Sequence, residues 1–376
     1  MSLSSFYSKR WFLVNEESYK YPDLIISEFK PKSMLVTDEH IPERAKFPVI
    51  DAHNHLFSDP NPSEIVESMN KVGVKAFINL TGNTEFTFDE SGYTAKKRNI
   101  GYFMQRYADK YPGRFYCFTM SLFANLSDKI LIKDENFTEE AIEELRSDIK
   151  KGAIGLKITK ELGLRFKDYK NQFIPIDDKR LDPIWQEAGK IGIPVLIHAS
   201  DPAAFFLPID KHNEHYQTLR LAPDWSFYGS YFSKEELLAQ RDRMIEKHPE
   251  TTFICTHVAN YPENLRYVSK FLDTHPNAYI DIAARMDELG RQPYTSREFF
   301  IKYQDRILFG TDMPPLPEVY RSYFRFLETK DEYFDYPDYI GRFGYSRWRI
   351  YGLYLPDNVL EKVYYKNALK ILGISI

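Results

Sequence analysis

The sequence is poor in cysteine, and it has no long apolar run and no block of charge of one sign. Cys117 and Cys255 are the two cysteines among 376 residues, and both lie in apolar segments, so we expect two buried thiols and no disulfide framework. No segment has the length of a membrane span, and the chain does not begin with a basic and then an apolar stretch. We expect a cytoplasmic protein without a membrane partner. An exported protein whose signal segment was removed would show the same sequence features.

Charge is nearly balanced over the whole chain. The sequence has 50 Lys and Arg residues and 54 Asp and Glu residues, which gives a formal net charge of −4. It contains no basic cluster or stripe that would attract a phosphate backbone, so we expect no nucleic-acid partner. The 28 Phe and 27 Tyr residues suit a large core and an aromatic-lined pocket for a small molecule. A homo-oligomer is compatible with these features.

Apolar segments rich in β-branched residues alternate with amphipathic segments from Pro48 to about residue 330. This alternation is typical of βα units and a parallel sheet. We expect strands at residues 48–55, 75–81, 115–120, 153–158, 194–199, 251–257, 278–284 and 307–312. Eight strands in this α/β rhythm predict a closed (β/α)8 TIM barrel, a fold that the length of the chain accommodates.

The segments between the expected strands favour helices. We expect helices near residues 62–72, 94–111, 138–150, 181–191, 234–248, 262–274, 295–303 and 316–328, and a C-terminal helix at 357–372. Residues 1–46 lack clean periodicity and are expected to form an N-terminal extension, which leaves residues 47–376 for the barrel domain. Two connections, 200–233 and 329–355, exceed the usual loop length, and we expect them to be lid-like insertions.

The first expected strand ends in two histidines, His53 and His55. Successive side chains of a strand point to opposite faces, so two histidines spaced by two residues project from the same side. Two imidazoles that converge on one point favour a metal ion with nitrogen ligands, provided that other strands supply further donors. The alternative is a polar strand end whose histidines face solvent.

Other expected strands also end in polar side chains. In a barrel of this kind the active site lies at the carboxyl ends of the strands. Strands four, five, six and eight carry residues there that would face inward: Lys157, His198, His257 and Asp312. One such residue is easily explained as a satisfied polar group, but four histidines and an aspartate at the ends of four strands predict a shared site.

The strand-end residues resemble a motif of the amidohydrolase superfamily, namely Asp51-x-His53-x-His55 followed by His198, His257 and Gly310-Thr311-Asp312. In detail they resemble its amidohydrolase-2 branch, which contains metal-dependent hydrolases and non-oxidative decarboxylases. Tyr365-Lys366-Asn367-Ala368 also resembles the closing motif of that branch. The resemblance covers the chain from about Pro48 to the C-terminal helix, and residues 1–46 and the insertion at 329–355 lie outside it.

The resemblance implies one divalent metal ion, with zinc as the first candidate, held by His53, His55, His198 and Asp312. Three histidines and one carboxylate leave room for water or substrate, as in a catalytic zinc site. Such an ion lowers the pKa of bound water to about 7. The resemblance also implies that Asp312 binds the metal, takes the proton of the water, or does both in turn. His257 would act as an acid or base, or would polarise the substrate oxygen.

Lys157 leaves the number of metal ions open. Binuclear members of the superfamily use a carbamylated lysine on strand four to bridge two ions, and His198 and His257 then bind the second ion. Relatives with one ion also carry a lysine at this place, and we expect one ion here. The alternatives for Lys157 are a role in substrate binding and a structural ion pair with a carboxylate such as Asp201.

Further polar residues near these positions are candidates for substrate binding. Asp201 follows the histidine of strand five, and Arg285 follows the inward carboxylate Asp281 of strand seven. Arg285 and Arg291 are candidates for a bidentate clamp on a substrate carboxylate. The alternative for each arginine is an ion pair at the rim, which we favour for Arg291. The role of His215, in the first insertion, stays open.

Three functions are compatible with this site. We expect a metal-dependent hydrolase in which metal-activated water attacks an amide, lactone or ester bond of a small polar substrate. The first alternative is a lyase on the same scaffold, a non-oxidative decarboxylase or hydratase, in which His257 or Asp312 moves a proton. The second is a barrel that binds a ligand without turnover, which the set of donors at the strand ends disfavours. The fold does not identify the substrate.

Overall fold

A computed structural model describes residues 24–376 except 26–27, 30, 90–91, 127 and 337–347. The chain divides into two compact units, Met1–Val36 and Thr37–Ile376. The barrel and its site belong to the second unit. The expected boundary at residue 46 stays a prediction, and a residue just before it already contacts the barrel, because Ala45 N donates to Val72 O over 3.0 Å.

Parallel strands form two sheets, and within each sheet every strand pairs with the next barrel strand along the chain. One sheet has the order β1-β2-β5 and the other β7-β9-β10-β11-β12. The strands are β1 (Val49–Asn54), β2 (Val74–Asn79), β5 (Phe115–Cys117), β7 (Leu156–Ile158), β9 (Val195–Ile197), β10 (Phe253–Cys255), β11 (Ala278–Asp281) and β12 (Ile307–Leu308). Each overlaps one of the expected strands, and these predictions are confirmed.

Backbone hydrogen bonds join the two sheets at both seams. Between β12 and β1, Ala52 N donates to Phe309 O over 2.9 Å. Between β5 and β7, Thr119 N donates to Gly155 O over 2.9 Å. The strands therefore follow one another around a ring in which the first and the last are neighbours. The expected TIM-barrel class is confirmed, and the carboxyl ends of the parallel strands share one mouth.

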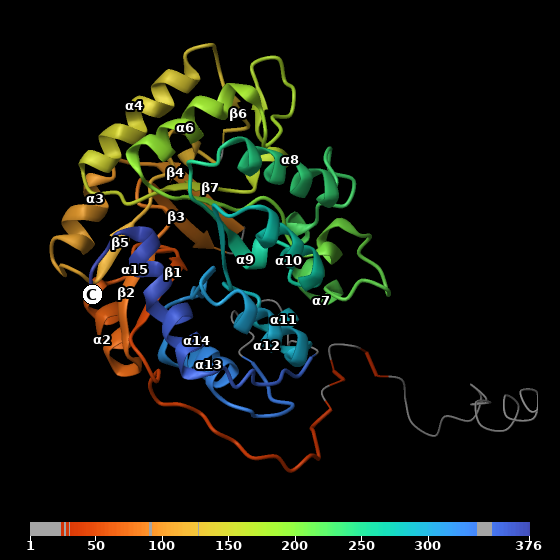
Figure 1. The fold of residues 1–376 in the computed structure, drawn as a ribbon. Helices are drawn as coiled ribbons and strands as arrows, with labels where there is room; N and C mark the ends of the chain where they lie inside the picture. Colours follow the sequence, from red (N-terminus) through yellow and green to blue (C-terminus); the bar gives the residue numbers. More distant parts are fainter. Residues whose placement is uncertain (1–23, 26–27, 30, 90–91, 127, 337–347) are drawn as a thin grey trace, which may run out of the picture. The chain divides into compact units, whose positions relative to one another are not determined.

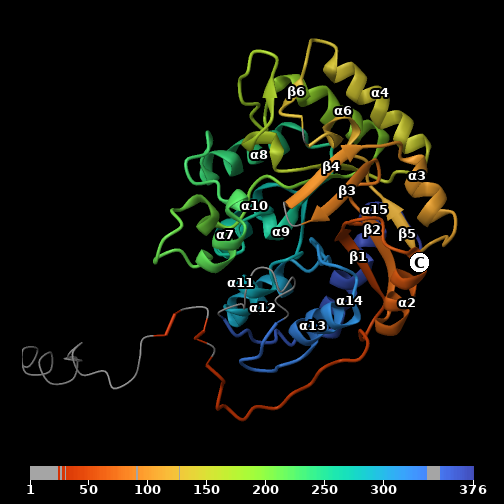
Figure 2. The same cartoon turned by 180° about the vertical axis from the view of Figure 1, so that it is seen from behind.

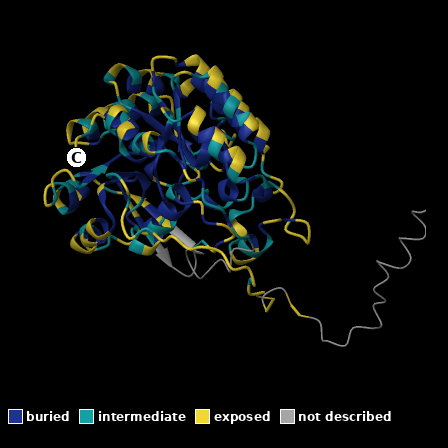
Figure 3. Ribbon diagram, turned by 60° about the horizontal axis from the view of Figure 1, so that its bottom comes forward, coloured by how far each residue is buried: buried dark blue, intermediate teal, exposed yellow. Residues whose placement is uncertain are grey.

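Helices cover the outer side of the strands (Figure 1). They are α2 (Pro62–Val72), α3 (Gly101–Phe103) with the π-helical η2 (Met104–Ala108), α4 (Phe137–Lys150), α6 (Asp182–Ile191), α8 (Lys234–Lys247), α10 (Leu265–Thr274), α12 (Pro293–Lys302) and α13 (Pro317–Glu328). Figure 3 shows the strands in the buried interior and the exposed residues along the outward faces of the helices. Local signals set their ends: α2 starts where Asn61 Oδ1 accepts Ser63 N over 3.1 Å and stops at Gly73, which has φ 90°.

The expectation of a helix over 94–111 is wrong in its first part. Residues Thr84–Asp89 (β3) and Gly92–Lys97 (β4) pair as an antiparallel hairpin. Polar and apolar side chains alternate through residues 85–88, and Thr and aromatic residues are frequent in the hairpin, so this period of two favours strands over a helix. The helix begins only after Asn99, whose Oδ1 accepts Gly101 N over 2.8 Å.

Short elements occupy the longer connections. They are η3 (Ser121–Ala124), β6 (Ile130–Ile132), α5 (Glu161–Leu164), β8 (Lys167–Asp168), η4 (Lys179–Leu181), η5 (Ala203–Phe206), α7 (Tyr216–Leu221), η6 (Pro223–Trp225), α9 (Thr256–Ala259) and α11 (Met286–Gly290). Of the expected insertion 329–355, residues 337–347 lie outside the described residues.

The expected C-terminal helix consists of three consecutive elements, α14 (Asp357–Glu361), the π-helical η7 (Lys362–Lys366) and α15 (Asn367–Leu372). Asn367 Nδ2 donates to Ile307 O over 2.7 Å and so fastens this helix to β12. Cys117 and Cys255 are free and buried, as expected. Burial raises the pKa of Cys255 to about 12, which keeps this thiol protonated near neutral pH. In the part of the chain that the structure describes, no helix is long and apolar enough to cross a membrane.

Candidate metal centre

His53 occupies the centre of the candidate site. Its side chain is buried at the end of β1, and its Nδ1 lies 2.8 Å from Oδ2 of Asp281 on β11. Burial alone would raise the pKa of Asp281, but its interactions with His53 and the hydrogen bond from His257 N lower it, so the ionised carboxylate accepts the Nδ1 proton of His53. The lone pair of His53 is then on Nε2, a buried atom without a hydrogen-bond partner among the described residues. An imidazole that a carboxylate orients in this way is the usual form of a metal ligand.

Asp312 faces three imidazoles. Its carboxylate oxygens lie 3.8 Å from Nε2 of His53, 3.6 Å from Nε2 of His55 and 3.8 Å from Nε2 of His257. The side chain of Asp312 is 25% exposed whereas that of His53 is 1% exposed, so Asp312 forms the open side of the site. Ligand atoms of His53, His55 and Asp312 all lie within 4.8 Å of one another, close enough for one ion to bind them.

Burial keeps two of these imidazoles neutral. It lowers the pKa of His55 well below its usual value, and the nearby charge of Lys157 lowers it further. Burial also lowers the pKa of His257 well below its usual value, and the nearby His198 and Arg285 add to this. Neutral imidazole is the form that binds a metal ion or accepts a proton.

His257 lies in a strained turn directly after β10. The four residues from His257 to Asn260 have φ between 51° and 57°. This left-handed conformation costs a non-glycine residue about 1–2 kcal/mol, and strain of this kind is concentrated at functional positions. In this turn Nδ1 of His257 donates to Ala283 O over 2.7 Å, which leaves the lone pair of the imidazole on Nε2.

His198 follows β9 and contacts His257 edge to face, with 4.5 Å between the ring centroids. Its Nε2 lies 3.3 Å from Oδ1 of Asp201. Burial lowers the pKa of His198, and Asp201 opposes this shift. His198 therefore interacts with Asp201 and is not one of the residues grouped within 4.8 Å around Asp312. Its role as a metal ligand stays a prediction.

Lys157 lies inside the barrel with 1% of the residue exposed. Burial lowers the pKa of Lys157 to about 8, although the charges of Asp312 and Asp281 oppose the shift. The ion pair that we considered between Lys157 and Asp201 is made by another lysine, since Nζ of Lys160 lies 2.5 Å from Oδ2 of Asp201. Lys160 lies two residues beyond the end of β7, directly before α5.

The two candidate arginines have different surroundings. Nη2 of Arg285 lies 3.8 Å from Oδ1 of Asp201, and its buried Nε has no hydrogen-bond partner among the described residues. Arg291 forms a rim ion pair, with Nη1 3.0 Å from Oε2 of Glu214, and its guanidinium lies 4.0 Å from the centre of the Trp348 ring. Arg285 is therefore the arginine with a donor left for a substrate oxygen.

Two buried aspartates, Asp281 and Asp51, support the site, although neither of them was assigned a role from the sequence. Asp281 orients His53, and its signal in the sequence was an inward position at the end of strand seven. Asp51 accepts hydrogen bonds from Thr311 N over 3.0 Å, from Thr311 Oγ1 over 2.8 Å and from Tyr320 OH over 3.0 Å. Asp51 thus fixes β1 against the segment that carries Asp312, and the sequence gives no signal for a pairing across 260 positions.

The β3–β4 hairpin lies beside the end of β1 (Figure 2). Ser58 N donates to Phe86 O over 2.7 Å. The ring centroids of Phe57 and Phe86 lie 5.5 Å and 5.8 Å from that of His55, and the two phenyl rings pack edge to face. An aromatic wall therefore stands next to His55 at the mouth.

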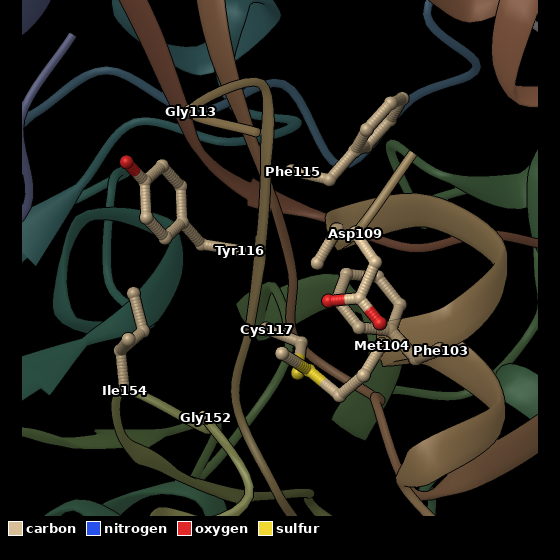
Figure 4. Close-up of a pocket in the computed structure, with 10 residues that line it drawn as sticks. Phe103, Met104, Asp109, Gly113, Phe115, Tyr116, Cys117, Gly152 and Ile154 are labelled. Carbon is tan, nitrogen blue, oxygen red and sulfur yellow. The ribbon is translucent and has the colours of Figure 1, made fainter. Parts of the chain in front are cut away.

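A cavity of about 240 Å³ lies elsewhere in the barrel (Figure 4). Its lining is mostly apolar and includes Phe103, Met104 and Ile154, and Asp109 is its single charged residue among the described residues. Phe115 begins β5, and Ile154 precedes β7, so the cavity lies toward the amino ends of these strands. The imidazoles lie at the carboxyl ends, and we assign no function to this cavity.

Gly310 lies just after β12 and packs closely against His53 of β1. A Cβ atom added to Gly310 would meet Cβ of His53 at 2.6 Å and N of His53 at 3.1 Å. We expect Gly310→Ala to displace His53 from Asp312 and to lower the affinity for zinc by about 10–100-fold, the usual effect of disturbing the support of a ligand. Overpacking should also cost about 1–3 kcal/mol. Zinc titration of the apoprotein and urea unfolding measure the two effects.

Gly113→Ala is the matched control for this variant. Gly113 has φ 76°, and no described atom lies within 4 Å of an added Cβ. The control therefore loses stability through backbone strain alone and leaves the site intact. Equal zinc affinity of wild type and Gly310→Ala would contradict the argument from close approach.

The sequence matches the family model described as amidohydrolase (Amidohydro_2) over residues 50–374. The chain belongs to the amidohydrolase family. The resemblance inferred from the strand-end motif is thereby confirmed, and the members of this family are metal-dependent enzymes that act as hydrolases or decarboxylases. No curated protein matches the chain at a significant level.

Solved structures with the same fold include decarboxylases. The chain is 15% identical to a 2,6-dihydroxybenzoate decarboxylase from Rhizobium, with a TM-score of 0.52 over 87% of this chain and 99% of the other. It is 14% identical to a dihydroxybenzoic acid decarboxylase from Polaromonas sp. JS666, solved with bound manganese and 2-nitroresorcinol, with a TM-score of 0.52 over 87% of this chain and 97% of the other. At such identities the likeness establishes the fold alone.

The donors in this amidohydrolase fit a divalent metal ion. Nε2 of His53 is buried and lacks a partner among the described residues, and Asp281 fixes the proton of that imidazole on the other nitrogen. Together with His55 and Asp312, it forms a set of two imidazoles and a carboxylate that is suited to zinc and similar first-row ions. These residues could hold the metal on which enzymes of the family depend.

Proposed function

We propose that this amidohydrolase is a metal-dependent hydrolase that cleaves an amide, lactone or ester bond of a small, carboxylate-bearing substrate. The observation that carries the proposal is the position of the Asp312 carboxylate within 3.8 Å of Nε2 atoms of three histidines. One divalent ion, zinc in the first instance, would bind to His53, His55, His198 and Asp312. When bound, such an ion activates water and polarises the scissile carbonyl group.

Asp312 is the proposed general base. Its side chain is 25% exposed and lies between the buried imidazoles and the mouth, where water and substrate enter. A carboxylate in this position takes a proton from the attacking water and returns it to the leaving group.

His257 is the proposed second proton-transfer group. Its Nδ1 donates to Ala283 O, so the neutral imidazole accepts a proton or a hydrogen bond only through Nε2. That atom lies 3.8 Å from Oδ2 of Asp312. A proton on Nε2 would pass to a substrate oxygen or leaving group that lies between the two side chains.

Substrate recognition is assigned first to Arg285. Its buried Nε lacks a partner among the described residues, and Asp201 at 3.8 Å holds the guanidinium in place. Lys157 is the proposed second contact because its amine lies inside the barrel near Asp312. Arg291 is the weaker candidate, since Glu214 and Trp348 already contact its guanidinium.

A non-oxidative decarboxylase is the second candidate function. The rings of Phe57 and Phe86 beside His55 favour a ring-bearing substrate. Enzymes with this fold decarboxylate dihydroxybenzoates, and one of them was solved with manganese. In this reaction Arg285 would hold the carboxylate until it leaves as carbon dioxide, and Asp312 or His257 would give the proton that replaces it on the ring carbon.

Product analysis separates the two candidates. Protein loaded with zinc or with manganese is incubated with lactones, N-acyl amino acids and dihydroxybenzoates. Hydrolysis yields a new carboxylic acid, whereas decarboxylation releases carbon dioxide and removes the carboxylate. We expect hydrolysis that is lost on dialysis against a chelator and restored by the ion. Carbon dioxide release from dihydroxybenzoates would favour the lyase, and turnover that survives complete removal of metal would overturn both proposals.

A further inference from the structure

A second group of metal-ligating side chains lies between the first insertion and α11. His215 belongs to the insertion and precedes α7, whereas Asp287 and Glu288 lie on α11, which follows β11. One ligand atom from each residue lies within 4.8 Å of the others, and Nε2 of His215 is 3.9 Å from Oε1 of Glu288. None of these three residues belongs to the proposed centre at the mouth.

Buried atoms of this group lack partners. The side chain of Glu288 is 1% exposed and that of His215 is 9% exposed. Nε2 of His215 has no hydrogen-bond partner in the part of the chain that the structure describes, and the carboxylate oxygens of Glu288 have none there except the adjacent carboxyl group of Asp287. Buried polar atoms without partners are unfavourable, and at 3.9 Å Nε2 of His215 lies too far from Oε1 of Glu288 for a hydrogen bond, which leaves space for a cation between them.

The neighbouring positive side chains do not fill this role. Arg291 binds Glu214, with Nη1 3.0 Å from Oε2, and Nη1 of Arg285 donates to Ala284 O over 2.5 Å. No hydrogen bond joins the side chains of Arg285 and Glu288 among the residues that the structure describes.

We propose that His215, Asp287 and Glu288 bind a divalent first-row metal ion such as zinc at a second site, apart from the centre at the mouth. One imidazole nitrogen and two carboxylates suit zinc or manganese better than calcium or magnesium, which prefer oxygen ligands throughout. The ion would join the 200–233 insertion to α11, which follows β11, and so fix the insertion to the barrel. The ring centroids of His215 and Trp348 are 5.4 Å apart, so Trp348 lies close enough to report on the site.

The zinc content of the full-length protein tests this proposal. Apoprotein is incubated with zinc and desalted, and the zinc per chain is measured for wild type, His215→Ala and Glu288→Gln. We expect each variant to hold about one zinc ion fewer per chain than wild type. Glu288→Gln keeps the shape of the side chain and removes its charge, and an unchanged circular dichroism spectrum shows that the fold is intact. His212→Asn is the matched control, since His212 is an exposed histidine of the same insertion, and it should keep the wild-type content.

Asp312→Asn distinguishes this site from the centre at the mouth. If only the assignment of the metal centre at the mouth is wrong, Asp312→Asn will keep the zinc content of the wild type, and Glu288→Gln will still lose one ion. Equal zinc content in wild type, His215→Ala and Glu288→Gln would overturn the second site.

A cobalt(II) titration gives an independent reading, because this ion quenches tryptophan fluorescence at short range. We expect the quenching seen in wild type to be reduced in Trp348→Phe and in Glu288→Gln. Quenching in Glu288→Gln that equals that of the wild type would also overturn the proposal.

Discussion

Asp312→Asn should abolish turnover and release most of the metal from the mouth of the barrel. The substitution removes the carboxylate that lies 3.6–3.8 Å from the Nε2 atoms of three histidines, and with it both an anionic ligand and the proposed base. We expect kcat/KM to fall by about 10⁴-fold or more, because a proton-transfer group contributes 10²–10⁴-fold and loss of the ion removes further activation. Steady-state kinetics and metal analysis of the desalted protein measure the two effects.

The backbone does not complicate this experiment. Asp312 has φ 52°, and asparagine tolerates the left-handed region as well as aspartate does. Asp305→Asn is the matched control, because Asp305 is an exposed residue before β12 that pairs with Lys362 over 2.8 Å. It should keep wild-type metal content and activity. Wild-type activity and metal content in Asp312→Asn would contradict both roles of this residue.

The barrel could be predicted from the sequence because its determinants are local. Strand periodicity and the order of βα units depend on neighbours in the chain, and every expected barrel strand is present. The convergence of His53, His55, His257 and Asp312 followed from topology, since parallel strands of a closed barrel bring their carboxyl ends to one mouth.

The remaining features of the site depend on contacts between distant segments, which leave no periodic signal. The sequence placed Asp201 next to His198 but did not distinguish Lys157 from Lys160 as its partner, a choice that the path of the chain after β7 decides. Most of β4, residues 94–97, was interpreted as the start of a helix, because its alternation is short and a genuine helical segment follows it. The grouping of His215 with α11 joins residues that are more than 70 positions apart, and only the fold reveals it.

His257→Asn should slow the reaction and leave the metal in place. Its imidazole lies 3.8 Å from Asp312 but is held by Ala283 O, and its backbone has φ 55°. Asparagine tolerates this backbone conformation, so the variant removes the imidazole without adding strain to the turn. We expect kcat to fall by about 10²–10⁴-fold, the usual contribution of a positioned proton-transfer group, with metal content near that of the wild type.

The metal content and the kcat of His257→Asn together assign the role of His257. Loss of metal from His257→Asn would make the residue a ligand, which favours a second ion beside a carbamylated Lys157. Near-wild-type kcat would make it a structural neighbour of the site. His275→Asn is the control, because His275 precedes β11 at the opposite ends of the strands and pairs locally with Thr274 over 2.9 Å. Since the control removes an imidazole far from the mouth, a fall in kcat that is confined to His257→Asn, at constant metal content, would be specific to proton transfer at the site.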